Sequence, residues 1–282
     1  MFRNLKYIKL TSILTYGFYW LSIKFGFDYK EKQGYERYFY ALQNINSTPL
    51  FLSRFILAKI NLLKNNLNVF LRKGSSDVEV FEQVLVNQEY FPLLEKLSFT
   101  GSHNIKIVDC GANIGLSAMY FNLYFKQKTE LYLLEPFQDN LSLIKKNLEE
   151  NSISATVLDK ALWTSNGKLS LDNSFRDGKE WSLTVKEDVK GKIQGITLKE
   201  LMLDLDLTEI DILKVDIEGS EFPVFIESKE NLSCLNKVKY LFMEIHDDIG
   251  DRKRLYEVLI TQNFEIVEFG ELTLFINKQF LK

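Results

Sequence analysis

Short apolar runs alternate with amphipathic stretches along the chain from about residue 69 to the C-terminus. The apolar runs predict strands at Leu67–Arg72 and near residues 105–109, 130–134, 155–158, 210–215, 239–245, 264–268 and 272–277. Helical spacing predicts helices over Val78–Leu97, from near Leu116, and over Gln138–Asn151. Strands that alternate with helices predict a mainly parallel sheet that binds ligands beyond the carboxyl ends of its strands. A Gly-Glu turn joins the last two strands, which predicts an antiparallel hairpin there.

The first 68 residues have a different pattern, and we expect a helical extension there, followed by the main domain at residues 69–282. Residues 10–23 form an uncharged run of 14 residues, which is shorter than the ~20 residues needed to span a bilayer. A positively charged start precedes this run, as in a signal peptide, but no small-residue cleavage site follows it. We therefore expect residues 1–27 to form a helix packed on the rest of the protein. The alternatives are a helix at a membrane surface and a contact between subunits. Arg54–Leu63 predicts a further helix.

The composition agrees with an intracellular enzyme. A chain of 282 residues with 46% hydrophobic residues can bury a large core. The net charge of −3 gives no reason to expect a nucleic-acid partner, which would normally require a basic surface. Cys110 and Cys234 are too few for a disulfide framework, so we expect the cytoplasm, with peripheral membrane attachment only through residues 1–27. The sequence leaves the oligomeric state open.

The most informative segment is Ile105–Gly115, which predicts a buried strand, a glycine turn and a helix start. Gly111 and Gly115 allow backbone angles that other residues rarely adopt, and they let a ligand approach the main chain. The free N–H groups at the helix start then face that ligand. This corner is typical of nucleotide-cofactor sites in doubly wound sheets. The dinucleotide fingerprint GxGxxG would need glycine in place of Asn113 and Leu116, which disfavours a nicotinamide-dependent oxidoreductase.

A second apolar strand ends in a carboxylate, Glu135, which lies 24 residues after Gly111 and directly before Pro136. An acid at the tip of the next strand, about 20 residues past a glycine turn, can accept both hydroxyl groups of a ribose. The alternative is a solvated acid at a strand end, which is the usual environment of a glutamate. The spacing favours the ribose role.

Acidic side chains also follow two later strands. Asp216, Glu218 and Glu221 come directly after the apolar run 210–215. Carboxylates this close in sequence are costly unless they bind a cation, share a proton or face water. Glu244 and His246 stand two residues apart near the end of the next strand, so they point to the same face. A histidine beside a carboxylate can act as a general base, although a lone histidine is more often structural.

Together these motifs resemble the FkbM family of S-adenosylmethionine (SAM)-dependent methyltransferases, and the pattern DxGxNxG resembles the SAM loop of Rossmann-like methyltransferases. The matching segments are LRKGSSDVEVFEQVLVNQEYFPL (71–93), IVDCGANIGLSAMYF (107–121), LLEPFQDNLSLIKKNLEEN (133–151), KALWTSNGKLSL (160–171), ITLKELM (196–202), IDILKVDIEGSEFPVF (210–225) and YLFMEIHDD (240–248). The resemblance spans about residues 69–276. The joint occurrence of SSDVEVF, EPF, KVDIEGSE and MEIH is more specific than the glycine loop alone.

The resemblance implies an α/β, Rossmann-like SAM methyltransferase with a mostly parallel seven-stranded sheet and an antiparallel last strand. Members of the family act mainly on hydroxyl groups, often of sugars or polyketide-like products, so we expect a carbohydrate or glycan acceptor. The alternatives are a non-sugar acceptor and a non-catalytic SAM-binding or scaffold protein of the same fold. We expect SAM to bind along Asp109, Gly111, Ala112, Asn113, Gly115, Glu135, Pro136 and Asp216, with its adenine near Asp159, Lys160 and Ala161.

The chemistry of methyl transfer assigns roles to the acidic groups. The SAM sulfonium is already a strong electrophile, so the reaction mainly requires positioning. A hydroxyl is a poor nucleophile until its proton is accepted or a cation lowers its pKa. We expect His246, or one of the carboxylates of Asp216, Glu218, Glu221 and Glu244, to be the base. The alternative is that the acids hold Mg²⁺, Mn²⁺ or Ca²⁺, and metal-free base catalysis is preferred.

One segment inside the main domain has two interpretations. Residues 172–195 follow a short predicted strand at Leu169–Leu171 and contain Arg176, Lys179 and Trp181. They are expected to form either a lid over the acceptor or a solvated loop with Trp181 packed beneath it.

Overall fold

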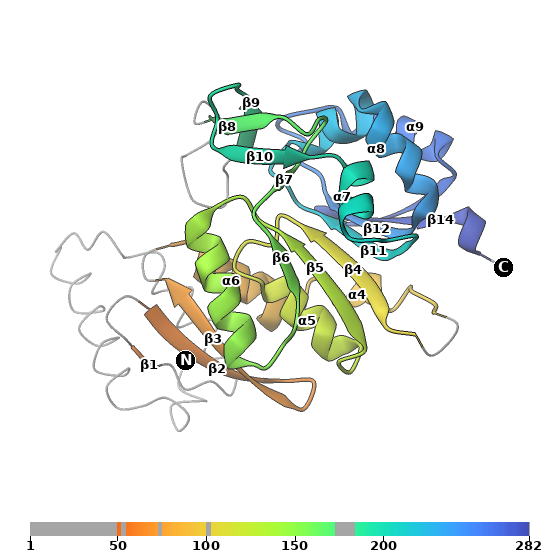
Figure 1. Cartoon of the computed structure of the whole chain (residues 1–282). Helices are drawn as coiled ribbons and strands as arrows, with labels where there is room; N and C mark the ends of the chain where they lie inside the picture. Colours follow the sequence, from red (N-terminus) through yellow and green to blue (C-terminus); the bar gives the residue numbers. More distant parts are fainter. Residues whose placement is uncertain (1–49, 52–54, 73–74, 100–102, 173–183, 282) are drawn as a thin grey trace, which may run out of the picture. The chain divides into compact units, whose positions relative to one another are not determined.

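The computed structural model describes residues 50–51, 55–72, 75–99, 103–172 and 184–281 (Figure 1). Two compact units are formed, one by residues up to Tyr90 together with Leu143–Ile153, and the other by Phe91–Ser142 together with Ser154–Lys282. The predictions for residues 1–27, Arg176, Lys179 and Trp181 lie outside the described residues. Within the described ranges, no helix has the length and apolar character required to cross a membrane.

A seven-stranded sheet runs through the second unit in the order β13-β14-β12-β11-β4-β5-β6. Its strands are β4 (Ile105–Cys110), β5 (Thr129–Leu134), β6 (Thr156–Leu158), β11 (Ile210–Val215), β12 (Val238–Glu244), β13 (Phe264–Phe269) and β14 (Leu272–Asn277). The pairs from β12 to β6 are parallel, whereas β14 is antiparallel to both β12 and β13. The predicted Rossmann-like α/β sheet with an antiparallel last strand is confirmed.

The strand order reverses between β4 and β11. From β4 the chain continues to β5 and β6 on one side, and it later returns to β11 on the other side of β4. Both central strands are buried along almost their whole length, which explains why they are continuous apolar runs in the sequence. A reversal of strand order leaves a crevice beyond the strands' carboxyl ends, where ligands bind in this class of fold.

Short helices connect these strands. Those of the second unit are α4 (Phe91–Leu94), α5 (Leu116–Tyr124), α7 (Leu198–Asp204), the π-helix η3 (Pro223–Glu227), α8 (Lys229–Cys234), η4 (Leu235–Lys237), α9 (Arg252–Thr261) and η5 (Lys278–Phe280). The helix α6 (Gln138–Glu150) contributes residues to both units. The predicted helices at Leu116 and Gln138 are confirmed.

A small second sheet includes two strands from the segment for which a lid or a loop is predicted. It has the order β7-β10-β8-β9, with β7 (Ala161–Leu162), β8 (Lys168–Asp172), β9 (Thr184–Glu187) and β10 (Ile193–Ile196). Its residues Leu162, Leu169 and Ile196 belong to the same buried core as Val108 and Leu213 of the large sheet. The solvated-loop alternative is therefore wrong for residues 184–187, which pair with β8. The lid alternative stays a prediction.

The first unit corrects the expectation of a helical extension. It contains a three-stranded sheet of β1 (Leu50–Phe51), β2 (Phe55–Leu62) and β3 (Asn65–Arg72), followed by α3 (Asp77–Phe81) and the π-helix η2 (Glu82–Val86). The helix predicted over Arg54–Leu63 is wrong, because the residues of β2 are buried alternately, which is the period of a strand. Leu63 and Lys64 have positive φ angles and close the β2–β3 hairpin. The strand β3 runs across the predicted boundary at residue 68, and residues 1–49 lie outside the described part of the chain.

The single helix predicted over Val78–Leu97 is also wrong in its length. The chain forms α3 and η2 and then breaks before α4. Gln88 has a φ angle of +52°, which no helix accommodates. Pro92 lies in the first turn of α4, a position that needs no N–H donor from it.

Candidate functional site

The loops after β4 and β11 contact each other at the reversal of strand order. The N–H of Asp216 donates to the carbonyl of Cys110 (3.1 Å), which continues the pairing beyond the strands. Gly111 has a φ angle of +82°, and a Cβ atom there would collide with the main-chain carbonyl of Asp216. Asn113 (φ +50°) and Gly115 (φ +85°) are also left-handed and turn the chain into α5. The glycine at 111 is therefore required by the neighbouring loop as well as by its own turn.

A buried lysine joins these two strand ends. Lys214 lies in β11 with 3% of its surface exposed, and its Nζ donates to the carbonyl of Gly111 (2.8 Å). The same ammonium forms ion pairs with Asp109 (3.0 Å) and Asp216 (3.3 Å). Asp109 is fully buried and also accepts a hydrogen bond from the Ser117 hydroxyl; burial raises the pKa of Asp109, although Lys214 lowers it. The sequence analysis missed Lys214, although a lysine inside an apolar strand is a signal, because a buried ammonium needs partners.

The tip of β5 carries Glu135, which is 3% exposed. Its Oε2 accepts the N–H of Asn113 (2.9 Å) and its Oε1 accepts the N–H of Phe137 (3.0 Å). Burial raises the pKa of Glu135 to about 7, although hydrogen bonds from Phe137, Asn140 and Asn113 favour the charged form. A carboxylate has about four acceptor positions, so acceptor capacity remains for a ligand hydroxyl group beside these three hydrogen bonds.

These loops surround a cavity of about 80 Å³ that is open to solvent. It is lined by Gly111, Asn113, Glu135, Pro136, Phe137, Asn140, Lys160, Ala161, Leu162, Val185, Asp216, Ile217, Glu218 and Ser220. Seven of the predicted cofactor residues are among these: Gly111, Asn113, Glu135, Pro136, Lys160, Ala161 and Asp216. Asp109, Ala112, Gly115 and Asp159 are not in the lining, and the Asp159 carboxylate accepts a hydrogen bond from Gln138. Sequence reasoning missed Asn140 and Phe137. Both donate hydrogen bonds to the Glu135 carboxylate, as Asn113 does.

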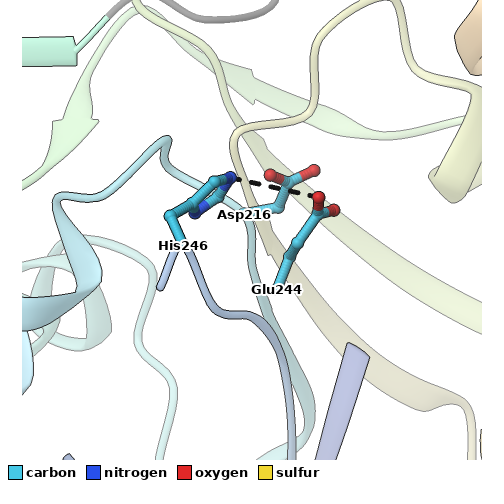
Figure 2. A group of neighbouring side chains, drawn as sticks. All are labelled: Asp216, Glu244 and His246. Carbon is cyan, nitrogen blue, oxygen red and sulfur yellow. Dashed lines mark ion pairs between the residues drawn. The ribbon is translucent and has the colours of Figure 1, made fainter. Parts of the chain in front are cut away.

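The predicted catalytic side chains gather beside this cavity. Figure 2 shows Asp216, Glu244 and His246 pointing toward one another from the ends of β11 and β12. His246 Nε2 lies 3.5 Å from Glu218 Oε2 and 3.9 Å from Glu244 Oε1. Asp216 and Glu218 line the cavity, whereas Glu221, Glu244 and His246 are not among the lining residues. The structure thus brings all five candidates together. Two of them, Asp216 and Glu218, line the cavity, and the other three do not.

Glu221 supports this arrangement from a fully buried position. Its Oε2 accepts the N–H of Gly219 (2.8 Å), and its Oε1 accepts the main-chain N–H of His246 (2.9 Å). The same Oε1 lies 3.0 Å from Nδ1 of the imidazole, so the carboxylate fixes both the loop and the ring.

The charge state of His246 follows from these neighbours. Burial lowers its pKa, but the hydrogen bond that the ring donates to Glu221 and the charges of Glu221, Glu218 and Asp216 raise the pKa of His246 to about 9. The imidazole is therefore positively charged at neutral pH, with a proton on each ring nitrogen. The predicted role of His246 as a general base requires a neutral ring, a condition that is met here only above about pH 9.

Residues 109–279 match the model of the methyltransferase FkbM domain. The chain belongs to the FkbM methyltransferase family. The resemblance seen in the sequence motifs is thus confirmed, over a range that contains the glycine loop, Glu135 and the acidic cluster. No curated protein matches the chain.

Solved structures of related fold include an FkbM methyltransferase from Methylobacillus flagellatus. It is 18% identical with a TM-score of 0.46, and the match covers 71% of this chain and 53% of that one. This chain therefore spans about half the length of the Methylobacillus protein. A fibrillarin from Aeropyrum pernix, solved with bound SAM, is 11% identical with a TM-score of 0.38, and 65% of this chain and 70% of that chain are covered. A TrmK from M. capricolum, solved with S-adenosylhomocysteine, is 14% identical with a TM-score of 0.32 and 62% coverage of both chains.

FkbM methyltransferases use SAM as their cofactor, and two features of this family member fit that ligand. Gly111 and Asn113 of the first loop line the cavity. Glu135 is a buried carboxylate that lines the same cavity and suits a pair of ribose hydroxyls.

Proposed function

We propose that this FkbM methyltransferase transfers the methyl group of SAM to a hydroxyl oxygen of a carbohydrate-type acceptor. The observation that carries the proposal is that one cavity is lined both by Glu135 and by the carboxylates of Asp216 and Glu218. The first group suits the ribose of the cofactor, and the other two suit hydroxyl groups of an acceptor. The family membership supports methyl transfer, and the carboxylates support a hydroxyl-rich acceptor.

The cofactor half of the proposal uses residues from three loops. SAM supplies an electrophilic methyl group when it is bound. Glu135 binds the ribose, with Asn113 and Phe137 holding its carboxylate in place through their main-chain N–H groups. Lys160 and Ala161 line the part of the cavity assigned to the adenine. Lys214 keeps the loop at Gly111 in position through its hydrogen bond to the Gly111 carbonyl.

The acceptor half of the proposal depends on the acidic residues that face the cavity. Glu218 accepts the proton of the acceptor hydroxyl, because His246 is already protonated near neutral pH. The oxygen then forms a bond to the methyl carbon while the bond from that carbon to sulfur breaks and its electron pair stays on sulfur. Asp216 orients the acceptor, and Glu221 positions the loop through Gly219 and His246.

The test is an acceptor screen with the purified full chain. SAM is incubated with nucleotide sugars, free saccharides and non-sugar alcohols, and the products are examined by mass spectrometry for the gain of one methyl group. We expect methylated saccharides with wild type and a rate lowered by roughly 10²–10⁴-fold in Glu218→Gln. The exposed residue Glu230 provides the matched control, Glu230→Gln. Methylation of non-sugar alcohols alone would refute the carbohydrate assignment, and SAM binding without any turnover would favour a non-catalytic protein.

A further inference from the structure

Three side chains beside the cavity form a set of converging donor atoms. One ligand atom from each of Asp216, Glu244 and His246 lies within 4.8 Å of the other two. The pairing of β11 with β12 explains this, because Val215 is in register with Met243, so the next residues, Asp216 and Glu244, are neighbours. His246 comes two residues after Glu244 and reaches the same face (Figure 2).

The imidazole distinguishes this set from an ordinary cluster of surface acids. His246 is 7% exposed, and its Nδ1 and main-chain N–H both face the same oxygen of Glu221. Because that oxygen belongs to a carboxylate, Nδ1 is the nitrogen that carries the hydrogen in a neutral ring. Nε2 then faces the carboxylates of Glu218 and Glu244, at 3.5 Å and 3.9 Å. Positive charge is favourable between these groups, and a cation bound at Nε2 replaces the proton that this nitrogen carries at neutral pH.

The arrangement of Glu221 matches the surroundings of metal-binding histidines. Such histidines almost always donate their second ring N–H to a carboxylate, a main-chain carbonyl or water, which fixes the ring and raises its basicity. Glu221 does this from a fully buried position, and its other oxygen is held by Gly219. The histidine is thus held in place from the side that faces away from Asp216 and Glu244.

The spacing of the atoms suits a divalent cation. An ion at ~2.1–2.4 Å from each ligand holds neighbouring ligand atoms roughly 3–3.4 Å apart and opposite ones roughly 4.2–4.8 Å apart. The 3.9 Å between His246 Nε2 and Glu244 Oε1 lies between these two ranges, and the 4.8 Å limit for the whole set equals the upper end of the second. Small side-chain rotations would complete the coordination. One imidazole and two carboxylates suit an ion such as Mn²⁺, which accepts both nitrogen and oxygen ligands.

We infer that Asp216, Glu244 and His246 bind one divalent cation of the Mn²⁺ type at the edge of the cavity. Asp216 belongs both to this set and to the cavity lining, so the remaining coordination positions face the place assigned to the acceptor. The role of the cation in catalysis rests on the proposed function: it lowers the pKa of an acceptor hydroxyl, whose proton passes to Glu218. The methyl carbon then bonds to that oxygen, and the electron pair of the carbon–sulfur bond stays on sulfur.

The test measures Mn²⁺ binding directly, without turnover. Full-length protein is freed of metal with EDTA, and free Mn²⁺ is followed by electron paramagnetic resonance during titration. We expect one saturable site in wild type, at least about tenfold weaker binding in Glu244→Gln and Asp216→Asn, and no change in Glu230→Gln. Thermal unfolding and SAM binding show whether each variant is folded. Wild type without saturable binding, or folded variants that bind as wild type does, would overturn the inference.

Methyl-transfer assays separate this inference from the proposed function. Turnover that is lost in EDTA and restored by Mn²⁺ supports both the catalytic cation and the proposed methyl transfer. Turnover that is indifferent to EDTA overturns the catalytic cation and leaves the methyltransferase intact. Saturable Mn²⁺ binding at these residues, without methylation of any saccharide, keeps the site and rejects the proposed acceptor.

Discussion

Replacement of Glu135 by glutamine tests the cofactor site most sharply. Glutamine keeps the size of the side chain but has one acceptor oxygen and one amide donor. In the wild type, Oε2 accepts from Asn113 and Oε1 from Phe137, so the amide group of the variant must face one N–H that needs an acceptor. The substitution therefore removes the charge from the ribose contacts and places a donor against a donor in the loop.

The expected loss can be worked out from these contacts. A hydrogen bond to a charged group contributes about 1.5–3 kcal/mol, and glutamine weakens the two that the ribose would make. Since glutamine still offers one oxygen, we expect SAM to lose about 2–4 kcal/mol of binding free energy in total. This loss corresponds to roughly 30- to 900-fold weaker SAM binding. Isothermal titration calorimetry of wild type, Glu135→Gln and Glu130→Gln measures this directly. Glu130 is the matched control, because it lies in the same strand but not in the cavity lining. SAM affinity that is unchanged in Glu135→Gln would refute the ribose role.

The same variant should change the pH dependence of stability. The pKa of Glu135 is raised from 4.5 to about 7 in the folded chain without ligand, so the native state holds this proton more tightly than the unfolded state does. Its contribution to the free energy of unfolding is fully present below about pH 4.5 and is lost as the pH rises through 7, on the order of 3 kcal/mol in all. In denaturant titrations, the difference between Glu135→Gln and wild type should therefore grow in favour of the variant from pH 5 to pH 7. A difference that is constant over this interval would contradict the raised pKa.

The remaining predictions concern the loops and the imidazole. Gly111→Ala should abolish SAM binding in calorimetry, because the added Cβ collides with a main-chain carbonyl, whereas Gly270→Ala, where the Cβ meets nothing, should cost only about 1 kcal/mol of stability in denaturant titrations. Lys214→Met should lower the free energy of unfolding by about 3–5 kcal/mol, because it leaves the buried Asp109 carboxylate without its cation, and a melting temperature equal to wild type would argue against that ion pair. His246→Ala should lower the methyl-transfer rate by at least about tenfold with SAM affinity nearly intact, because it removes a ligand of the inferred cation, whereas lower thermal stability with normal specific activity would make the histidine purely structural.

The parts of the fold that were predictable from sequence are those where local pattern and tertiary environment agree. The strands β4 and β11 are buried on both faces, so they are apolar throughout and easy to recognise. Gly111 and Glu135 were predictable because a glycine turn and a strand-end acid at a fixed spacing can be recognised from the sequence alone. The helix predicted over Arg54–Leu63 failed because a period of two in a short apolar run was taken for helical spacing.

Other features depend on partners that are remote in sequence. The partners of the Lys214 ammonium are apparent only when β11 is paired with β4. This pairing brings the Gly111 carbonyl and the Asp109 carboxylate to the ammonium. Glu221 was predicted as one of several acids, but its role in holding His246 depends on the register of β11 and β12. Of the small sheet of β7 to β10, only the strand at Leu169–Leu171 was predicted, and it lies within β8; the other three strands are only two to four residues long.

One ammonium group contacts both sides of the reversal in strand order. Lys214 binds the Gly111 carbonyl and Asp109 on one side and Asp216 on the other. A displacement of either loop would change the electrostatic energy of the other, so we expect SAM binding and acceptor binding to be thermodynamically linked. Linkage is reciprocal: the factor by which SAM changes the affinity for the acceptor is the factor by which the acceptor changes the affinity for SAM. Lys214→Met should reduce that factor, even though the lysine is not among the residues that line the cavity.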